Sequence, residues 1–395
     1  MSKRLYLDIH VIQTVPPSCL NRDDTGSPKT AIYGGVQRAR VSSQSWKRAM
    51  REMFKENLDE ACLGVRTKKI VELIVERVKQ RSEVPVEGVE GKVIDTINLA
   101  SAKAEKPIIP TSAKKAKKRN NDKDSDNDNT KDVDALFFIG NVEADNLADL
   151  VLAWIMDDRK PTKNDVQSAL NQDKNNQSHA IEIALFGRMV AKAPDLNTDA
   201  SSQVAHALST HRVDIEYDYF TAVDDLASED NRGAAMIDTV EFDSATFYRY
   251  ATIAVHELFG QLAHDVDVTA LAASEFVKAF ITSMPTGKQN AFANRTPADA
   301  VLVSLRTDQP LNLVGAFEEA VRLKPDESGY VKPSIDRLVK YYQKVVPVLI
   351  DAPQQSWGIG VDLSGVAELP DLSTLLLSIN SALSSDLGST IVDGN

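Results

Sequence analysis

The chain has 395 residues, of which 43% are hydrophobic and 26% are charged, as in a globular protein with room for two or three lobes. Its net charge of −12 excludes a uniformly basic nucleic-acid coat, and no apolar run approaches the length of a membrane span. Two cysteines cannot supply a disulfide framework or a four-cysteine zinc site. We therefore expect a cytoplasmic protein without a cofactor, a bound metal or a membrane anchor.

The start of the chain is basic although the whole protein is acidic. The first 51 residues hold nine Lys and Arg against three Asp, which gives this part a charge of about +6. Leu5–Gln13 alternates apolar and polar residues and is predicted as a strand. Ser18–Gly35 is rich in Pro and Gly and is predicted as an irregular loop. A basic segment in an acidic protein points to an anionic polymer bound in one groove.

Gln44–Leu58 is predicted as a helix, because Ser42 and Ser43 offer N-cap hydroxyls ahead of it. It has an apolar face and a basic face, formed by Trp46, Met50, Phe54 and Leu58 and by Lys47, Arg51 and Lys55. Basic residues in the first turns oppose the helix macrodipole, and a phosphate bound at the first N–H groups would offset this cost. On composition alone, a solvated basic face explains the pattern equally well.

A helical lobe is predicted over residues 61–178. Lys68–Arg81, Leu147–Met156 and Asn164–Lys174 read as its helices. Inside it, residues 101–132 are first Lys-rich and then Asp-rich, and we expect a disordered insertion that contributes almost nothing to a core. Its basic block, Lys114–Arg119, could touch nucleic acid transiently or could serve only to solubilise the loop.

The second half resumes with elements of a sheet domain. Its predicted strands and helices are Ile181–Val190, Phe247–Val255, Asp267–Ser283, Ala300–Leu305, Pro310–Leu323, Pro333–Leu349 and Leu369–Ser384. Arg212–Phe220 alternates like a strand and Leu226–Glu241 reads as a tip, so we expect a projecting arm over about 212–245. The sheet elements follow the order β-α-β-β-α-β of a ferredoxin-like or RNA-recognition-motif fold, in the α+β class, built from residues 1–60 and 179–395.

The run SCLNRDDTGSPKTAIYGGVQRARVSSQSWKRAMR (Ser18–Arg51) resembles the start of the CasC family, the backbone subunits of type I-E CRISPR Cascade complexes. The resemblance continues in Phe186–Met189, Ala205–Leu226, Phe247–Ile253 and Gly287–Phe292. It covers nearly the whole chain apart from the insertion and the last stretch. It implies a hand-like fold in which the sheet domain is the palm, the helical lobe the fingers and the arm a thumb that folds over guide RNA.

The resemblance also implies a function and partners. A CasC-like chain is a non-catalytic subunit that multimerises along crRNA and presents it for pairing with invading DNA. Its partners would be crRNA, further copies of itself, target DNA through the guide, and the large, small, 5′-end-capping and 3′-end-capping subunits of Cascade.

By the same resemblance, several residues are candidates for RNA contacts. Phosphates and sugars would be held by Asn21, Arg22, Lys29, Arg40, Ser42, Gln44, Lys47, Arg48 and Arg51. Met189 and Phe220 would lie against bases, Thr221 would lie with Phe220 where the thumb meets the RNA, and Lys288 would lie near the RNA strand. From the residues alone, Met189 could instead fill a core and Phe220 could pack under its own arm. The chain departs from relatives that carry basic residues after the paired glycines, because it has Val36 and Gln37 there.

Two other functions fit parts of the sequence. A metal-dependent RNA nuclease could use Asp23 with Asp24, or Asp224 with Asp225, to activate water. Because Asp23 and Asp24 lie between Arg22 and Lys29, an ion pair that shapes the loop is their simpler use. A protein-interaction scaffold without nucleic acid is the third possibility, and it leaves the basic helix unexplained.

Overall fold

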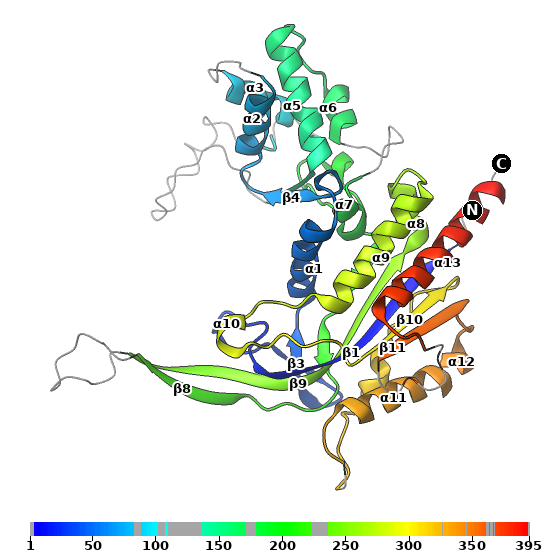
Figure 1. The fold of residues 1–395 in the computed structure, drawn as a ribbon. Helices are drawn as coiled ribbons and strands as arrows, with labels where there is room; N and C mark the ends of the chain where they lie inside the picture. Colours follow the sequence, from blue (N-terminus) through cyan, green and yellow to red (C-terminus); the bar gives the residue numbers. More distant parts are fainter. Residues whose placement is uncertain are drawn as a thin grey trace, which may run out of the picture. The chain divides into compact units, whose positions relative to one another are not determined.

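The protein is described by a computed structural model in which the chain forms two compact units (Figure 1). The described residues are 4–82, 88–101, 107–109, 136–170, 179–222, 236–325, 327–344, 346–360, 363, 366 and 368–393. The sheet unit consists of Met1–Phe54, Ser202–His256 and Ala270–Asn395, and the helical unit of Lys55–Ser201 and Glu257–Thr269. No helix in the described ranges is both long and apolar enough to cross a membrane.

The sheet unit is built on one large antiparallel sheet, which confirms the predicted α+β class. Its order is β11-β10-β1-β9-β7-β3-β2, and β6 and β8 also pair with β9. The strands are β1 (Tyr6–Ser18), β2 (Thr30–Tyr33), β3 (Val36–Val41), β6 (Ser202–Val204), β7 (Ala207–Ser209), β8 (Glu216–Ala222), β9 (Met236–Ala254), β10 (Ala300–Arg306) and β11 (Gln355–Gly360). β1 lies at the centre, with Ile9 opposite Val303 of β10 and Ala251 of β9.

One face of this sheet carries helices α1 (Ser43–Asn57) and α9 (Val266–Thr282). The apolar face predicted for the first helix is confirmed, because Trp46, Met50 and Phe54 are all buried. Burial of these large side chains, at roughly 25 cal/mol per Å² of apolar surface, is the main force that holds α1 on the sheet. The basic face of α1 is therefore directed away from the sheet core.

Arg249 of β9 lies buried between the sheet and both helices. Its guanidinium carbon is 3.7 Å from the centre of the Trp46 ring and 4.6 Å from that of Phe280. The guanidinium donates to Gln13 Oε1 at 2.5 Å and also to the Phe280 carbonyl. Burial lowers the pKa of Arg249 to about 9. One side chain thus joins β1, β9, α1 and α9.

The other face of the sheet is covered by α11 (Val331–Lys344) and the 3₁₀ turn Leu313–Phe317. Their apolar side chains pack on Tyr248, Tyr250 and Leu302. His10 Nδ1 lies 2.9 Å from the Tyr248 hydroxyl, and the His10 ring stacks on Tyr250. These aromatic residues belong to the core, so this face is not an open platform for stacking bases.

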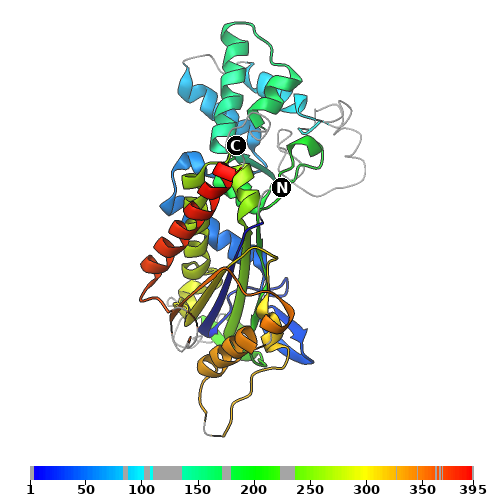
Figure 2. The same ribbon diagram turned by 90° about the vertical axis from the view of Figure 1, so that its right-hand side faces the viewer.

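The C-terminal helix α13 (Leu372–Asp393) completes the sheet unit and is the red helix in Figure 2. Gln354, directly before β11, donates from Nε2 to Asp386 at 2.9 Å. The buried side chains of Leu375, Ile379 and Leu383 recur at helical spacing, which explains why the apolar end of the sequence forms a helix.

The helical unit has an aliphatic core of its own. It contains a two-stranded sheet of β4 (Gly64–Thr67) and β5 (Phe137–Gly140), and the helices α2 (Ile70–Arg81), α3 (Val89–Leu99), α5 (Asn141–Met156), α6 (Lys163–Leu170) and α7 (Ile181–Phe186). α8 (Val255–Gln261) begins in the sheet unit and ends here. The insertion predicted over 101–132 contributes more than expected, because Ile108 and Ile109 are buried in this core. Its charged stretch from residue 110 onwards lies outside the described residues.

One strand predicted for the sheet domain was wrong. Ile181–Val190 is not a strand, because Ile181–Phe186 forms helix α7. All six of these residues are buried, including Glu182, and a run that is buried on every side fits a helix as well as a strand. The second strand of the expected β-α-β-β-α-β order is replaced by β6 and β7, which both pair with β9. The helical unit therefore extends to Ser201, whereas the helical lobe was predicted to end at residue 178.

The predicted loop Ser18–Gly35 is also not wholly irregular, because β2 lies within it and pairs with β3. Gly34 and Gly35 both have positive φ, as a tight hairpin turn requires. A Cβ on Gly34 would collide with the Glu318 carbonyl oxygen. The paired glycines are therefore a structural feature of the hairpin.

Other boundaries shifted. Pro310–Leu323 contains only the 3₁₀ turn, and Pro333–Leu349 divides into α11 and α12 (Val346–Leu349). In the arm, β8 begins at Glu216, and β9 begins at Met236 within the predicted tip. Residues 171–178 and 223–235 lie outside the described residues.

Replacing Arg249 with Ala should lower the free energy of unfolding by about 3 kcal/mol, because it leaves a cavity beside Trp46 and an unpaired Gln13 oxygen. Urea denaturation measures the change. Arg212→Ala is the matched control, because its ion pair with Asp214 is exposed and should contribute less than about 1 kcal/mol. Equal losses in the two variants would contradict this account of Arg249.

Candidate nucleic-acid interface

The basic segment is organised by Asn21 in the loop after β1. Its Oδ1 accepts a hydrogen bond from the Ser42 N–H at 2.9 Å, and its carbonyl accepts one from the Lys29 N–H at 2.9 Å. The Arg40 N–H in turn donates to the Lys29 carbonyl at 2.8 Å. Asn21 thus joins the loop to the start of α1, and its side-chain oxygen is engaged within the protein.

Ser42 caps helix α1, as the sequence predicts. Its Oγ accepts from the Ser45 N–H at 3.4 Å, and its carbonyl accepts from the Trp46 N–H at 3.3 Å. Beyond the cap, Gln44 and Arg48 are exposed, while Lys47 and Arg51 are half-buried along the neighbouring row. The cap, the helix N-terminus and two rows of polar or basic side chains therefore occupy one end of α1.

A second group of cations gathers beside the hairpin of β2 and β3. Arg40 Nε donates to the Thr30 carbonyl at 3.1 Å, and Arg40 Nη1 lies 3.1 Å from His206 Nδ1. Burial, followed by the charges of Arg40 and Lys29, lowers the pKa of His206. Nothing in the local sequence indicates that residue 206 returns to the hairpin, so this contact could not be predicted.

Gly287 lets the loop that carries Lys288 pack closely against the loop after β1. A Cβ on Gly287 would collide with the Leu20 carbonyl oxygen and lie 2.6 Å from that of Cys19, so the two loops are in close contact. Burial raises the pKa of the Cys19 thiol to about 11, and the charges of Lys288 and Arg22 act against this rise. Three segments, the loop after β1, the start of α1 and the loop before α10 (Gln289–Phe292), therefore share one region of the sheet unit.

The arm is the two-stranded ribbon of β8 and β9, with Phe220 opposite Asp238 and Thr221 opposite Ile237. Phe220 is 41% exposed, so it is not fully packed under the arm. Tyr217 and Tyr219 are 64% and 76% exposed, and sequence reasoning did not select them. Their period of two in an exposed ribbon was the available signal.

Met189 belongs to the helical unit and is 82% exposed, which excludes the core-filling interpretation. Arg188, its neighbour, is buried in an ion pair with Glu143 at 2.6 Å. The two adjacent residues therefore have opposite environments.

Asp23, one of the acidic residues considered for metal binding, has another use in the structure. Asp23 Oδ1 accepts from the Thr25 N–H at 2.9 Å, the Thr25 hydroxyl at 2.7 Å and the Ser27 N–H at 3.1 Å. The Thr25 hydroxyl hydrogen bond is the main cause that lowers the pKa of Asp23. No group of three His, Cys, Asp or Glu suited to a metal ion occurs in the described ranges. Asp224 and Asp225 lie outside them.

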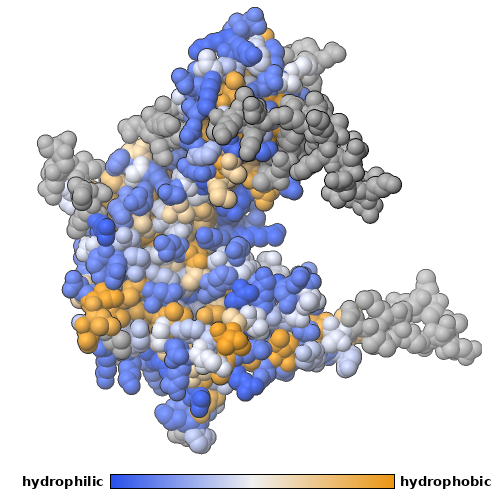
Figure 3. Space-filling view, turned by 180° about the vertical axis from the view of Figure 1, so that it is seen from behind, coloured by the Kyte–Doolittle hydropathy of each residue, from blue (hydrophilic) through white to orange (hydrophobic). Residues whose placement is uncertain are grey.

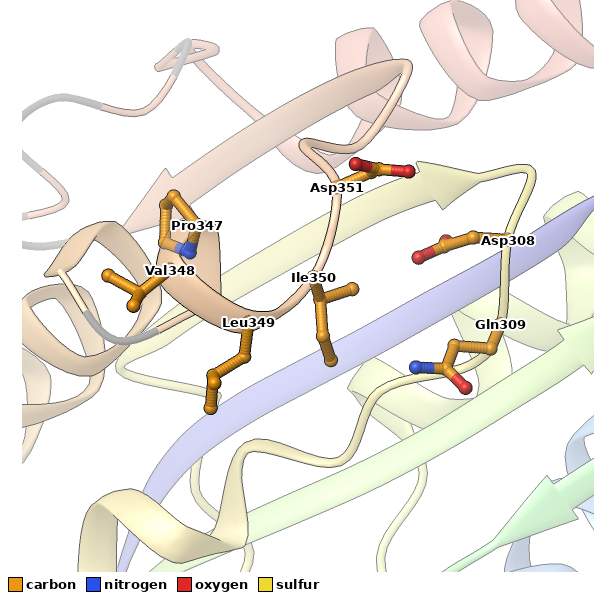
Figure 4. A pocket seen from close by; sticks show the side chains of 7 residues that line it. All are labelled: Asp308, Gln309, Pro347, Val348, Leu349, Ile350 and Asp351. Carbon is orange, nitrogen blue, oxygen red and sulfur yellow. The ribbon is translucent and has the colours of Figure 1, made fainter.

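A pocket of about 390 Å³ lies elsewhere in the sheet unit, beside α12 (Figure 4). It is lined by Asp308, Gln309, Pro347, Val348, Leu349, Ile350 and Asp351. Two carboxylates would repel a phosphate, and none of the expected RNA-binding residues lines it. Figure 3 shows an apolar area on the side of α12, where Val348 and Leu349 are 78% and 79% exposed.

The sequence matches the CT1975-like protein family over residues 7–375. The chain belongs to this family. The resemblance to CasC proteins is thereby confirmed. None of the curated proteins compared with it gives a significant match.

Two solved structures are similar to this CT1975-like chain over almost its whole length. A chain described as "CRISPR RNA-guided surveillance complex, pre-nicking" is 30% identical with a TM-score of 0.79, over 96% of this chain and 100% of its own. A chain described as "CRISPR RNA-guided surveillance complex" is 26% identical with a TM-score of 0.69, over 95% and 99%. The similarity includes both units and is not confined to a shared sheet.

Gly287→Ala should weaken RNA binding about tenfold, because the added methyl separates the Lys288 loop from Leu20. Fluorescence anisotropy with a guide-length single-stranded RNA measures the affinity. Gly388→Ala is the control, since a Cβ there meets no atom within 4 Å and Ala favours the helix. An unchanged affinity in Gly287→Ala would show that the loop contact does not position Lys288.

The contribution of Asp243 to the free energy of unfolding should depend on pH. It lies opposite Ser18, and burial raises its pKa from 3.8 to about 6. A raised carboxyl pKa favours the folded protein at low pH, and this contribution is lost as the pH rises through 6. Relative to the wild type, Asp243→Asn should therefore gain about 1 kcal/mol between pH 5 and pH 8.

Urea denaturation at both pH values measures this gain. Asp214→Asn, which changes an exposed carboxylate, is the control and should show less than half of it. If the difference in unfolding free energy between Asp243→Asn and the wild type stays constant from pH 5 to pH 8, the pKa of Asp243 is not raised by burial.

Proposed function

We propose that this protein is a non-catalytic, guide-RNA-binding backbone subunit of a type I-E CRISPR surveillance complex. Its family and the descriptions of both similar structures support this function. The observation that carries it is the basic region of the sheet unit. An acidic chain with a net charge of −12 gathers Lys29, Arg40, Lys47, Arg51 and Lys288 on segments that fold together.

We infer that the sheet unit is a ferredoxin-like palm. β1, α1, the β6–β7 pair, β9, α9 and β10 follow in the order β-α-β-β-α-β, and the strands adjoin as β10-β1-β9-β7. The helical unit would be the fingers, and the β8–β9 ribbon the thumb. Because α11 covers the face that carries His10 and Tyr248, RNA would bind at the edge of this palm.

The proposed binding mode reads the RNA backbone. Lys47, Arg51, Arg48 and Lys29 would contact phosphates, which hold the strand without reading its sequence. The bases would then remain available to pair with target DNA. Asn21 and Ser42, whose side chains hold the loop and cap the helix, would act by shaping this surface.

Contacts to bases would come from other residues. Met189 and Phe220 present exposed apolar side chains, and Thr221 follows Phe220 on β8. Lys288, whose charge acts on Cys19 as that of Arg22 does, would lie near the RNA strand. Copies of the chain would assemble along one crRNA in the cytoplasm, together with the large, small and capping subunits of the complex.

The test compares Lys47→Ala/Arg51→Ala with a double variant of the same charge and spacing. Lys340→Ala/Lys344→Ala also removes two cations four residues apart, from the exposed side of α11. Binding of a fluorescent guide-length RNA is measured at several salt concentrations. Each lost phosphate contact should reduce the slope of log affinity against log salt by about 0.7, so Lys47→Ala/Arg51→Ala should lose about 1.4.

The control variant should bind as the wild type does. Equal behaviour of both double variants would assign the basic face of α1 to solvent and overturn the proposed site. Running the RNA on a gel after incubation with Mg²⁺ tests the nuclease alternative. Intact RNA is expected, and cleaved RNA would call for Asp23→Asn and Asp224→Asn variants.

A further inference from the structure

Met189 is an exposed apolar residue between two buried neighbours. It is 82% exposed, whereas Arg188 and Val190 are buried. An apolar side chain gains nothing from water, and its neighbours fix the backbone on both sides of it. The hydrogen bonds around Met189 show what holds this exposed methionine in place.

Four hydrogen bonds donated by backbone N–H groups hold this short segment. The Arg188 N–H donates to the Thr198 carbonyl and the Thr198 N–H to the Arg188 carbonyl, both at 2.9 Å. The Val190 N–H donates to Asn197 Oδ1 at 2.6 Å, and the Gly187 N–H to the Ile183 carbonyl at 2.8 Å. Gly187 has a φ of 73°, and a Cβ there would lie 2.9 Å from the Thr198 carbonyl oxygen.

The Arg188 guanidinium adds three more bonds. Nε donates to the Leu196 carbonyl at 2.8 Å, Nη2 to the Leu170 carbonyl at 2.7 Å, and Nη1 to Glu143 Oε2 at 2.6 Å. The same Glu143 oxygen accepts the Gly140 N–H at 2.9 Å. The segment is thereby tied to α5, to the end of α6 and to the end of β5.

We propose that the buried Arg188–Glu143 pair is a positioning device that presents Met189 to one nucleobase of the bound RNA. This inference rests on the proposed function and adds residues that do not themselves touch RNA. A buried ion pair is a costly way to stabilise a core, but it fixes geometry. A methionine has three rotatable bonds, so a fixed backbone reduces the ordering cost of its contact. Its polarisable sulfur makes favourable contacts with aromatic rings, such as that of a base.

The experiment uses the full chain and guide-length RNAs in which 2-aminopurine replaces one base at a time. Its fluorescence reports how each position is stacked. Met189→Ala should change the signal at particular positions and weaken binding about tenfold, while Met189→Leu should retain most of both. Arg188→Lys keeps the charge but loses the forked hydrogen bonds, and should change the signal at the same positions.

Combining Arg188→Lys with Met189→Ala should produce little change beyond Met189→Ala alone, since both act on one contact. Arg81→Lys is the matched control, because its pairs with Asp145 and Asp149 lie in the same unit and are partly exposed. If Arg188→Lys fails to fold, Asn197→Ala replaces it, since this variant releases only the Val190 N–H. Thermal unfolding of every variant is recorded alongside.

Three results would overturn the positioning role. The first is an unchanged 2-aminopurine pattern and affinity in Met189→Ala. The second is an Arg188→Lys or Asn197→Ala protein that melts earlier but keeps the wild-type pattern, which would make the network purely structural. The third is a Met189→Ala protein that no longer binds another protein subunit but still binds RNA as the wild type does. In all three, salt-dependent binding that requires Lys47 and Arg51 would leave the proposed function standing, whereas no RNA binding by the wild type would overturn both.

Discussion

The stacking of Arg249 on Trp46 is the contact on which the basic region of the sheet unit depends. It lies where β1, β9, α1 and α9 meet, and the guanidinium also reaches Gln13 and the Phe280 carbonyl. Trp46 occupies the apolar face of α1, so its burial determines which way the helix is rotated. The side chains of Lys47 and Arg51 then point where they do because Trp46 and Met50 point inward. A cation buried in the core thus fixes the orientation of the cations at the surface.

The acidic net charge and the basic region are compatible because electrostatic attraction acts locally. At physiological salt the Debye length is about 8 Å, so distant carboxylates hardly weaken a group of nearby cations. Two carboxylates near the region, Asp23 and Asp243, are constrained. Asp23 is engaged by Thr25 and Ser27, and burial favours the neutral form of Asp243. This arrangement is consistent with binding of an anion at this one region, and it leaves the rest of the chain acidic.

The two units treat their exposed apolar residues in a similar way. In the helical unit, Met189 follows a buried arginine whose hydrogen bonds fix its backbone. In the sheet unit, Tyr219 and Phe220 lie on a ribbon fixed by its ladder with β9. In both cases, hydrogen bonds that fix the backbone hold an exposed apolar side chain at a defined place. In the proposed binding mode, both features would suit contacts with bases, and the cations would hold the phosphates.

Helical periodicity in the sequence predicted α1 and α9, and the Ser42 cap signal marked the start of α1. Alternation predicted β1, which extends further to Ser18, and a short apolar run predicted the fully buried β10. The motifs around Ser18–Arg51 were enough to indicate the family. Only the tertiary structure decided that Ile181–Phe186 is a helix, since a run buried on all sides has no informative period. It also decided the environments of Arg188 and Met189, which are adjacent in sequence but buried and exposed, respectively. The approach of His206 to Arg40 and of Gly287 to Leu20 depends on strand pairing and loop packing between distant segments, which no local pattern encodes.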